Sequence, residues 1–215
     1  MHVFDLTLPL GPHTPVLEGD PPVVLTTART HEADGYRVTA IALGSHVGTH
    51  LDAPRHFLAE GATLDSYPVD RFVRPGWIVD VRPLGAATPA AAAGPAGRSL
   101  TATLPRIDAA LLRERLRDVH LDAGDFLLLW TGGALVTDDA VPLLLESGAG
   151  LVGTDAYTLD DEPYPAHQAL LGAGVLLAEN LTGLDRPGPG RLMCAFLPLA
   201  VIDADGAPVR AVAWR

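Results

Sequence analysis

Residues 44–57 have the sequence GSHVGTHLDAPRHF, in which three of the eight histidines of the chain and one aspartate lie within eleven residues. These four side chains are His46, His50, Asp52 and His56. On an extended chain they would point to the same side, because their positions in the sequence differ by even numbers. On a helix, which turns by about 100° per residue, the last two would rotate away from the first two. Gly48 and Pro54 also disfavour a helix.

A straight strand would place His46 and His50 about 13 Å apart, since each residue adds roughly 3.3 Å. Zinc–nitrogen bonds are about 2.0–2.1 Å long, so these imidazoles could not then share an ion. Gly48 lies between them and tolerates the torsion angles of a tight bend or β-bulge. We therefore predict a strand that runs to about Ser45 and then turns. This turn would gather His46, His50 and Asp52 around one point.

A second pair of potential ligands lies downstream. Residues 165–171 are a predicted helix, because they begin with proline and end before the sequence Gly-Ala-Gly. His167 lies near the start of this helix. Glu179 follows the apolar run 175–178, a predicted buried strand, and open α/β sheets place their sites at the carboxyl ends of strands. From composition alone, Glu179 could also cap the strand and His167 could face solvent.

The composition excludes several kinds of active site. The 215 residues include no lysine, which excludes a Walker A loop, a Schiff base and a lysine general base. Cys194 is the single cysteine, so the chain cannot form an intramolecular disulfide, a Cys-only zinc site or a thiolate-held iron–sulfur cluster. A metal ion would have to be held by His, Asp and Glu.

Charge and hydropathy limit the partners. The net charge is −11 and the 15 arginines are scattered, which disfavours a nucleic-acid partner. No apolar run approaches the roughly 20 residues of a membrane span. The amino terminus lacks a basic region followed by an apolar run. We expect no membrane partner and a cytoplasmic location.

The patterning predicts one α/β domain over residues 1–215. Predicted strands cover residues 2–8, 23–29, 36–47, 77–81, 126–130, 151–154, 175–178 and 209–214. In residues 36–47 the second half is apolar on both faces, which predicts a strand that enters a core. Residues 107–119 are a predicted helix with one apolar stripe. The Ala-, Gly- and Pro-rich residues 84–99 predict a surface loop.

The motif HVGTHLDAPRHF resembles the His-x-Gly-Thr-His-x-Asp-x-Pro-x-His signature of the cyclase family, which includes bacterial kynurenine formamidases and isatin hydrolases. The resemblance extends over most of the chain. It implies a swivelling β/β/α domain, with a mixed sheet or barrel-like core flanked by helices. It also implies homodimers or homotetramers and a site for two divalent ions, zinc or manganese.

The resemblance also implies a role for each candidate residue. The first ion would be bound by His46, His50 and Asp52. The second would be bound by Asp52, His167 and Glu179, so that the aspartate bridges. Two ions about 3.5–4 Å apart supply hydroxide at neutral pH and polarise a carbonyl group. His56 would be the general acid and base that protonates the departing amine. The expected reaction is hydrolysis of an amide or formamide C–N bond in a small molecule.

One departure from the family pattern concerns the substrate. Kynurenine formamidases have Trp-Pro before the Gly-Asp of the amino-terminal loop, and this chain has Leu17-Glu18. Leucine keeps an apolar contact with the substrate but cannot stack on an aryl ring. Glu18 adds a negative charge that would repel an anionic amino acid. Trp130 could supply a replacement ring, although a bulky residue that ends a strand also fits a core position.

Two other functions fit the same residues. A biosynthetic cyclase or dehydratase could use the ions to stabilise an enolate or oxyanion, with His56 moving protons. A metal-binding protein without turnover is the other alternative. Such a protein has no use for His56, because holding a metal needs no additional acid–base group.

Overall fold

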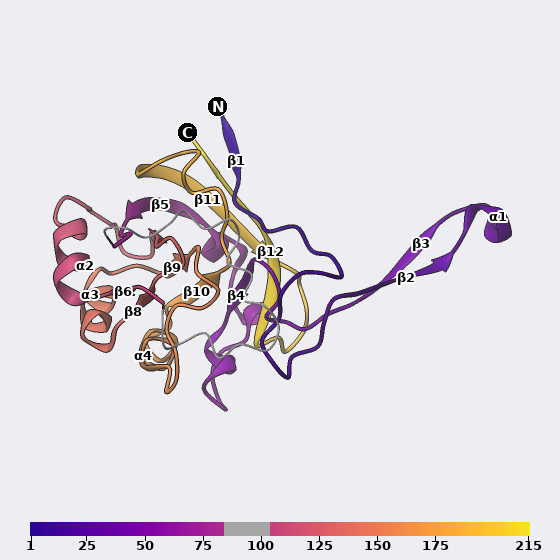
Figure 1. The fold of residues 1–215 in the computed structure, drawn as a ribbon, viewed down its shortest axis with the longest axis horizontal. Coiled ribbons are helices and arrows are strands. Elements are labelled where there is room, and N and C mark those ends of the chain that lie inside the picture. Colours follow the sequence, from indigo (N-terminus) through magenta and orange to yellow (C-terminus); the bar gives the residue numbers. More distant parts are fainter. Residues whose placement is uncertain (84–103) are drawn as a thin grey trace.

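The apolar runs of the sequence form a closed β-barrel in the computed structural model, which describes residues 1–83 and 104–215. The strand order is β1-β12-β11-β5-β7-β9-β10-β4, and β12 also pairs with β4, which closes the barrel (Figure 1). The strands are β1 Val3–Asp5, β4 His50–Asp52, β5 Val73–Asp80, β7 Phe126–Trp130, β9 Leu151–Thr154, β10 Leu176–Glu179, β11 Gly190–Pro198 and β12 Gly206–Trp214. The predicted α/β fold with a barrel-like core is confirmed.

Strands β5, β7, β9 and β10 are parallel, and three helices lie outside this half of the barrel (Figure 1). These helices are α2 Ala109–Leu116, α3 Val141–Glu146 and α4 Pro165–Gly172. The apolar residues form two cores, one inside the barrel and one between the barrel and the helices, and strand β7 contributes to both. Phe126 and Leu128 point into the barrel, whereas Leu127 and Leu129 pack under the helices. Parallel strands covered on both faces are apolar on both faces.

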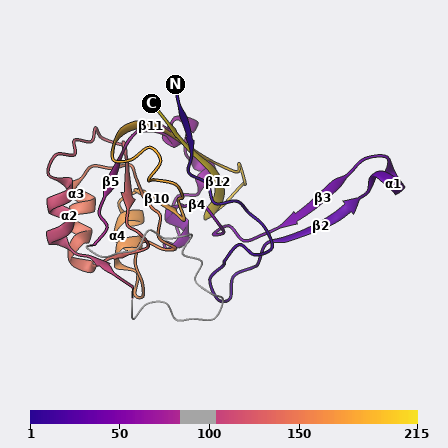
Figure 2. The same ribbon diagram turned by 45° about the horizontal axis from the view of Figure 1, so that its top comes forward.

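The strand predicted for residues 36–47 lies elsewhere than expected. Strand β3, Val38–Ala42, pairs with β2, Val24–Arg29, in a separate ribbon that leaves the barrel, with the short helix α1, His31–Asp34, at its tip (Figures 1 and 2). Every residue of both strands is exposed. The prediction that this segment enters a core of the chain is wrong. An apolar pattern predicts a strand, but it does not determine whether that strand joins the barrel.

Other predicted elements differ in extent. The helix predicted for residues 107–119 covers only Ala109–Leu116. It begins after Asp108, whose side chain caps the amino terminus of α2. Strand β11, helix α3 and the short parallel pair β6 Arg106–Ile107 and β8 Leu135–Val136 were not predicted. The low-complexity stretch 84–99 lies outside the described residues. Within residues 1–83 and 104–215, no helix is long and apolar enough to cross a membrane.

Candidate metal centre

Two neighbouring strands and one helix position four of the five predicted ligands, and His46 lies in the irregular segment before β4. In the antiparallel pair of β4 and β10, His50 lies directly opposite Glu179. Asp52 is two residues from His50 and so projects from the same face of the sheet. The intervening Leu51 points into the barrel core. The site therefore lies on the outer face of the barrel, where α4 contributes His167.

The carboxylate of Asp52 is at the centre of the cluster. Its Oδ1 atom lies 2.7 Å from His46 Nδ1 and 3.3 Å from His50 Nε2. Its Oδ2 atom lies 3.7 Å from His167 Nε2. Glu179 contacts His167 Nε2 at 3.1 Å through Oε1 and His50 Nε2 at 3.7 Å through Oε2. The structure thus brings the five candidates together in two groups that share Asp52. Their binding of ions stays a prediction.

The bend at Gly48 has the expected conformation. Its φ of +60° is in the left-handed region that favours glycine, and a Cβ there would lie 2.5 Å from Leu10 Cδ2. The preceding strand ends at Ala42 rather than near Ser45, so the bend is part of a longer irregular segment. The carbonyl of Gly48 lies 2.8 Å from His50 Nδ1. A hydrogen bond donated by Nδ1–H leaves Nε2 free to bind a cation.

Two aspartates that the sequence analysis missed orient the histidines. The Asp160 carboxylate is hydrogen-bonded to His167 Nδ1 and accepts a bond from the Ala166 backbone N–H. Asp205 Oδ2 lies 2.9 Å from His46 Nε2. Metal-binding histidines commonly present one ring nitrogen to the ion and the other to such a carboxylate. No sequence pattern distinguishes these two aspartates among the 26 acidic residues.

The carboxylates of the cluster raise the pKa values of two of its histidines. Burial lowers the pKa of His46, but the hydrogen bonds and negative charges of Asp52 and Asp205 together outweigh burial and raise the pKa to about 9. Burial also lowers the pKa of His167, yet the Asp160 and Glu179 carboxylates raise it to about 10. Buried carboxylates need positive partners, and in the chain alone imidazolium groups provide the charge. Divalent ions would supply it with neutral imidazoles as ligands, so this donor set fits such ions.

His56 lies at the mouth of the cluster. It is on the 3₁₀ turn Pro54–His56, and about a third of its side chain is exposed. Its ring stacks on the His46 ring, with centroids 3.8 Å apart, and its Nδ1 atom lies 3.6 Å from Asp205 Oδ2. Burial lowers the pKa of His56. His56 belongs to neither ligand group that contains Asp52, although it forms a third cluster with His46 and Asp205.

Comparison with known proteins identifies the family. The family model "Cyclase", described as "Putative cyclase", matches residues 4–161. This chain belongs to the cyclase family. A kynurenine formamidase from Salinibacter ruber is 34% identical to this chain over an alignment of 218 positions, which covers 99% of this chain and 97% of the relative. A kynurenine formamidase from Paracidovorax citrulli is 31% identical, over 98% of this chain and 95% of the relative.

Solved structures agree with this family assignment. "The Structure Of Potential Metal-Dependent Hydrolase With Cyclase Activity" is 26% identical to this cyclase-family chain, with a TM-score of 0.73 over 99% of this chain and 96% of that one. An isatin hydrolase bound to the product analogue thioisatinate is 23% identical, with a TM-score of 0.82 over 98% of this chain and 91% of that one. The latter shows a common fold. The resemblance inferred from the signature is confirmed.

Aromatic side chains line one side of the cluster in this cyclase-family protein. The rings of Phe57 and Tyr164 have centroids 5.6 Å apart, and they lie 5.1 and 5.6 Å from the His167 ring. Tyr164 precedes α4 with a φ of +60°, which is uncommon for a residue with a side chain. Sequence reasoning missed both as site residues. They provide an apolar surface beside the ligands.

The two predicted substrate contacts, Leu17 and Trp130, come from other parts of the chain than this aromatic surface. Trp130 packs against the barrel core, on the opposite side of the sheet from α4. The guanidinium of Arg82 lies 3.7 Å from the centre of the Trp130 ring, so one face of the indole is covered. Leu17 lies in the loop between β1 and β2, with 49% of its surface exposed. Substrate contacts by Leu17 and Trp130 stay predictions.

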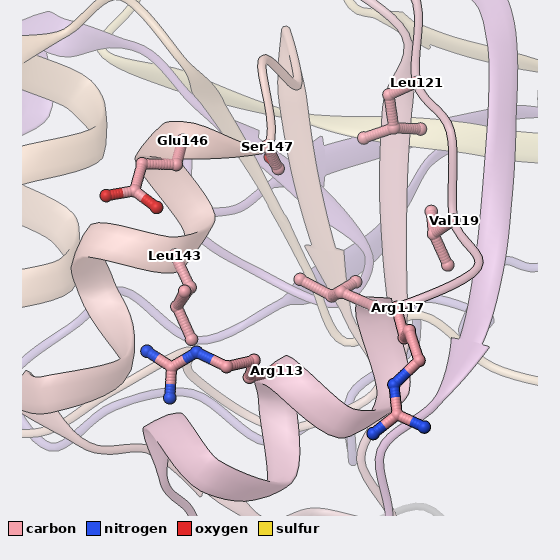
Figure 3. A pocket seen from close by; sticks show the side chains of 8 residues that line it. Arg113, Arg117, Val119, Leu121, Leu143, Glu146 and Ser147 are labelled. Atoms are coloured by element: carbon pink, nitrogen blue, oxygen red, sulfur yellow. The ribbon is translucent and has the colours of Figure 1, made fainter.

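A separate hollow lies between α2 and α3 (Figure 3). It has a volume of about 270 Å³ and is lined by Arg113, Leu116, Arg117, Val119, Leu121, Leu143, Glu146 and Ser147. It shares no residue with the cluster of candidate metal ligands. The candidate site of this cyclase-family protein is therefore the cluster on β4, β10 and α4.

Replacing Asp160 with asparagine is expected to weaken divalent-ion affinity by about 10- to 100-fold, the usual effect of removing a carboxylate behind a histidine ligand. The amide has one accepting oxygen, so it can keep only one of the hydrogen bonds from Ala166 N–H and His167 Nδ1, and it removes the charge that makes the His167 imidazole more basic. Zinc titration by calorimetry measures the change. Asp161→Asn is a matched control, because the neighbouring carboxylate pairs with Arg106 instead. Equal affinities in the two variants would contradict the assignment of Asp160.

Proposed function

We propose that this protein is a metal-dependent amidohydrolase that cleaves an amide or formamide C–N bond of a small molecule. The observation that carries the proposal is that the Asp52 carboxylate belongs to both histidine-containing groups, with the His56 side chain at the mouth of the cluster. The kynurenine formamidase names of relatives that align with nearly the whole chain support the same reaction.

The five clustered residues would hold two divalent ions, zinc or manganese. The first ion would be held by His46, His50 and Asp52, and the second by Asp52, His167 and Glu179. Ions bound there would acidify a water molecule and polarise a carbonyl oxygen of the substrate. The chain therefore needs no serine or cysteine nucleophile for this reaction.

His56 would move the protons of the reaction. Its Nδ1 atom faces the Asp205 carboxylate, which leaves Nε2 to take up a proton and deliver it to the departing amine nitrogen. Such a proton transfer contributes about 10²- to 10⁴-fold to a rate. The Asp205 carboxylate holds the ring in place and favours its protonated form during transfer.

The apolar part of the substrate would rest on the Phe57 and Tyr164 rings. Both rings contact the His167 ring, so a group placed on them lies next to the ligands. Aromatic rings bind planar groups through offset or edge-to-face contacts. They also exclude water from the same side of the cluster. An N-formylated aryl amine has the combination of a planar ring and a cleavable C–N bond that this arrangement suits.

The activity test combines metal analysis with a panel of N-formyl aryl amines, isatin and lactones. We expect hydrolysis of at least one C–N substrate, loss of activity after chelation, and recovery on addition of zinc or manganese. Elemental analysis should give two ions per chain. Product analysis separates the cyclase or dehydratase alternative, because only hydrolysis releases a free amine and an acid. Full activity in protein verified to contain no divalent ion would contradict the proposal.

Replacing Leu17 with tryptophan is expected to lower the KM for an N-formyl aryl amine by about two- to tenfold, since aromatic pairs add about 0.5–1.5 kcal/mol beyond burial. The KM for an alkyl formamide should change little, because an alkyl group cannot stack. Steady-state kinetics on both substrates measures the difference. Leu17→Ala is the control for the loss of the leucine itself. Unchanged KM values for both substrates would remove residue 17 from the substrate site.

A further inference from the structure

The hollow between α2 and α3 has the size of a small-molecule site (Figure 3). Its volume of about 270 Å³ is close to the lower end of the range for such sites, roughly 300–1,000 Å³. None of the candidate metal ligands lines it. A molecule held there would therefore be separate from the metal centre, and the inference drawn from it is independent of the proposed activity.

Four apolar residues contribute to the surface of the hollow. Leu116 ends α2, Val119 and Leu121 follow it in the connection to β7, and Leu143 lies on α3. All four are half-buried, because they also pack against the core between the barrel and the helices. Their positions are thus fixed by the fold, and their exposed parts offer an apolar group a surface that is already formed.

Two arginines border the same hollow. Arg113 and Arg117 are four positions apart, and Arg117 still has helical torsion angles, so both side chains leave the same side of α2. Figure 3 shows their guanidinium groups in the lower half of the view, and Glu146 of α3 in the upper half. The guanidinium groups therefore face one end of a ligand, and the carboxylate faces the other.

The two guanidinium groups are unpaired within residues 1–83 and 104–215, where neither forms a hydrogen bond or an ion pair. Asp139 lies within electrostatic range of Arg113. Its carboxylate, however, already accepts hydrogen bonds from the Thr137 hydroxyl and the Ala109 backbone N–H. The donors of Arg113 and Arg117 are thus available to a ligand.

The charges of the lining indicate the charge of the ligand. Arg113 and Arg117 contribute two positive charges and Glu146 one negative charge, so the net charge of the lining is +1. The whole chain has a net charge of −11, which repels anions in general and makes this positive region a local exception. A single negative charge complements the lining, whereas the Glu146 carboxylate disfavours a dianion.

We propose that the hollow between α2 and α3 binds a small organic carboxylate, with its apolar body on the four apolar residues and its carboxylate on Arg113 and Arg117. Guanidinium groups bind carboxylates through two parallel charge-assisted hydrogen bonds. The apolar surface gives binding energy, and the two arginines select the anion. A small molecule is favoured over a protein segment, because the volume of the hollow is at the lower end of the small-molecule range.

Calorimetric titration of the full chain with 3-phenylpropanoate tests the proposal. We expect one saturable site per chain with a Kd below about 1 mM. Arg113→Gln with Arg117→Gln should weaken binding by about 10- to 100-fold, since charge-assisted hydrogen bonds are lost. Arg115→Gln is the matched control, because Arg115 is an exposed residue of the same helix that does not line the hollow. It should bind like the parent. Circular dichroism verifies that each variant is folded.

A neutral analogue makes the test specific for the anion. 3-Phenylpropanamide has nearly the same shape but no charge, and it should bind the parent at least about tenfold more weakly than the carboxylate does. Equal affinities for the two probes would overturn the carboxylate as the recognised group. Lack of saturable binding to the parent would overturn the site itself.

The variants test where the probe binds. A double variant that binds 3-phenylpropanoate like the parent would overturn the proposal, because the probe would then be held elsewhere, for instance by ions at the metal centre. Equal weakening in the double variant and in Arg115→Gln would also overturn it, since any loss of positive charge from α2 would then have the same effect.

Discussion

Asp52→Asn is expected to lower hydrolytic activity by at least about 1,000-fold and to remove both divalent ions. Loss of a carboxylate behind a ligand costs about 10- to 100-fold in affinity or activity, and Asp52 is itself shared by both ligand groups. The amide oxygen is a neutral, weaker donor. The substitution also leaves the imidazoles of His46 and His50 without the buried charge that they face. Elemental analysis and steady-state kinetics measure both effects.

Glu60→Gln provides the control for Asp52→Asn, because Glu60 is an exposed carboxylate outside the cluster. This variant should keep the parent's metal content and activity. Thermal unfolding of both variants tests whether they are folded. An Asp52→Asn protein that is folded and retains two ions would contradict the bridging role. Retained activity would contradict the predicted role of Asp52 in the reaction.

His56→Ala should lower kcat by about 10²- to 10⁴-fold while the metal content stays that of the parent. The expected separation of these two effects follows from the position of His56, at the mouth and outside both groups that contain Asp52. A substrate whose leaving group needs no proton should be affected less. Kinetics on formamides with leaving amines of different basicity measures this difference.

His120→Ala is a suitable control, since His120 is exposed and lies outside the clusters. It should change neither kcat nor metal content. Two outcomes would contradict the acid–base role of His56. One is full activity of the His56→Ala protein. The other is the loss of an ion together with activity, which would make His56 a ligand through its cluster with His46 and Asp205.

Much of the candidate site could be predicted because the ligands lie close together in sequence or at strand ends. The even spacing of His50 and Asp52 places them on one face of β4, and Gly48 provides the bend. Asp160 and Asp205 could not be found in this way. Each lies in a turn without a distinguishing pattern, and its role depends on which histidine the fold brings beside it.

The fold could be predicted to the level of strands, helices and a barrel-like core. The parallel strands are continuous apolar runs, which are easily recognised. Strand β11 was not among the predicted strands, although its sequence contains the apolar run 192–197. It pairs with β5 and β12. The segment 36–47 shows a different limit. Its apolar faces were recognised, but periodicity does not determine whether such a strand joins the barrel or lies exposed in a separate ribbon.

Strand β4 has three residues, and it pairs with β10 on one side and β12 on the other. The seam of the barrel is therefore closed by the same short segment that carries His50 and Asp52. Cations bound by residues of β4, β10 and α4 would crosslink these elements at the seam. Their free energy of binding would add to the free energy of unfolding of the barrel. Backbone amides of residues 50–52 should therefore exchange with deuterium faster after a chelator has removed the ions.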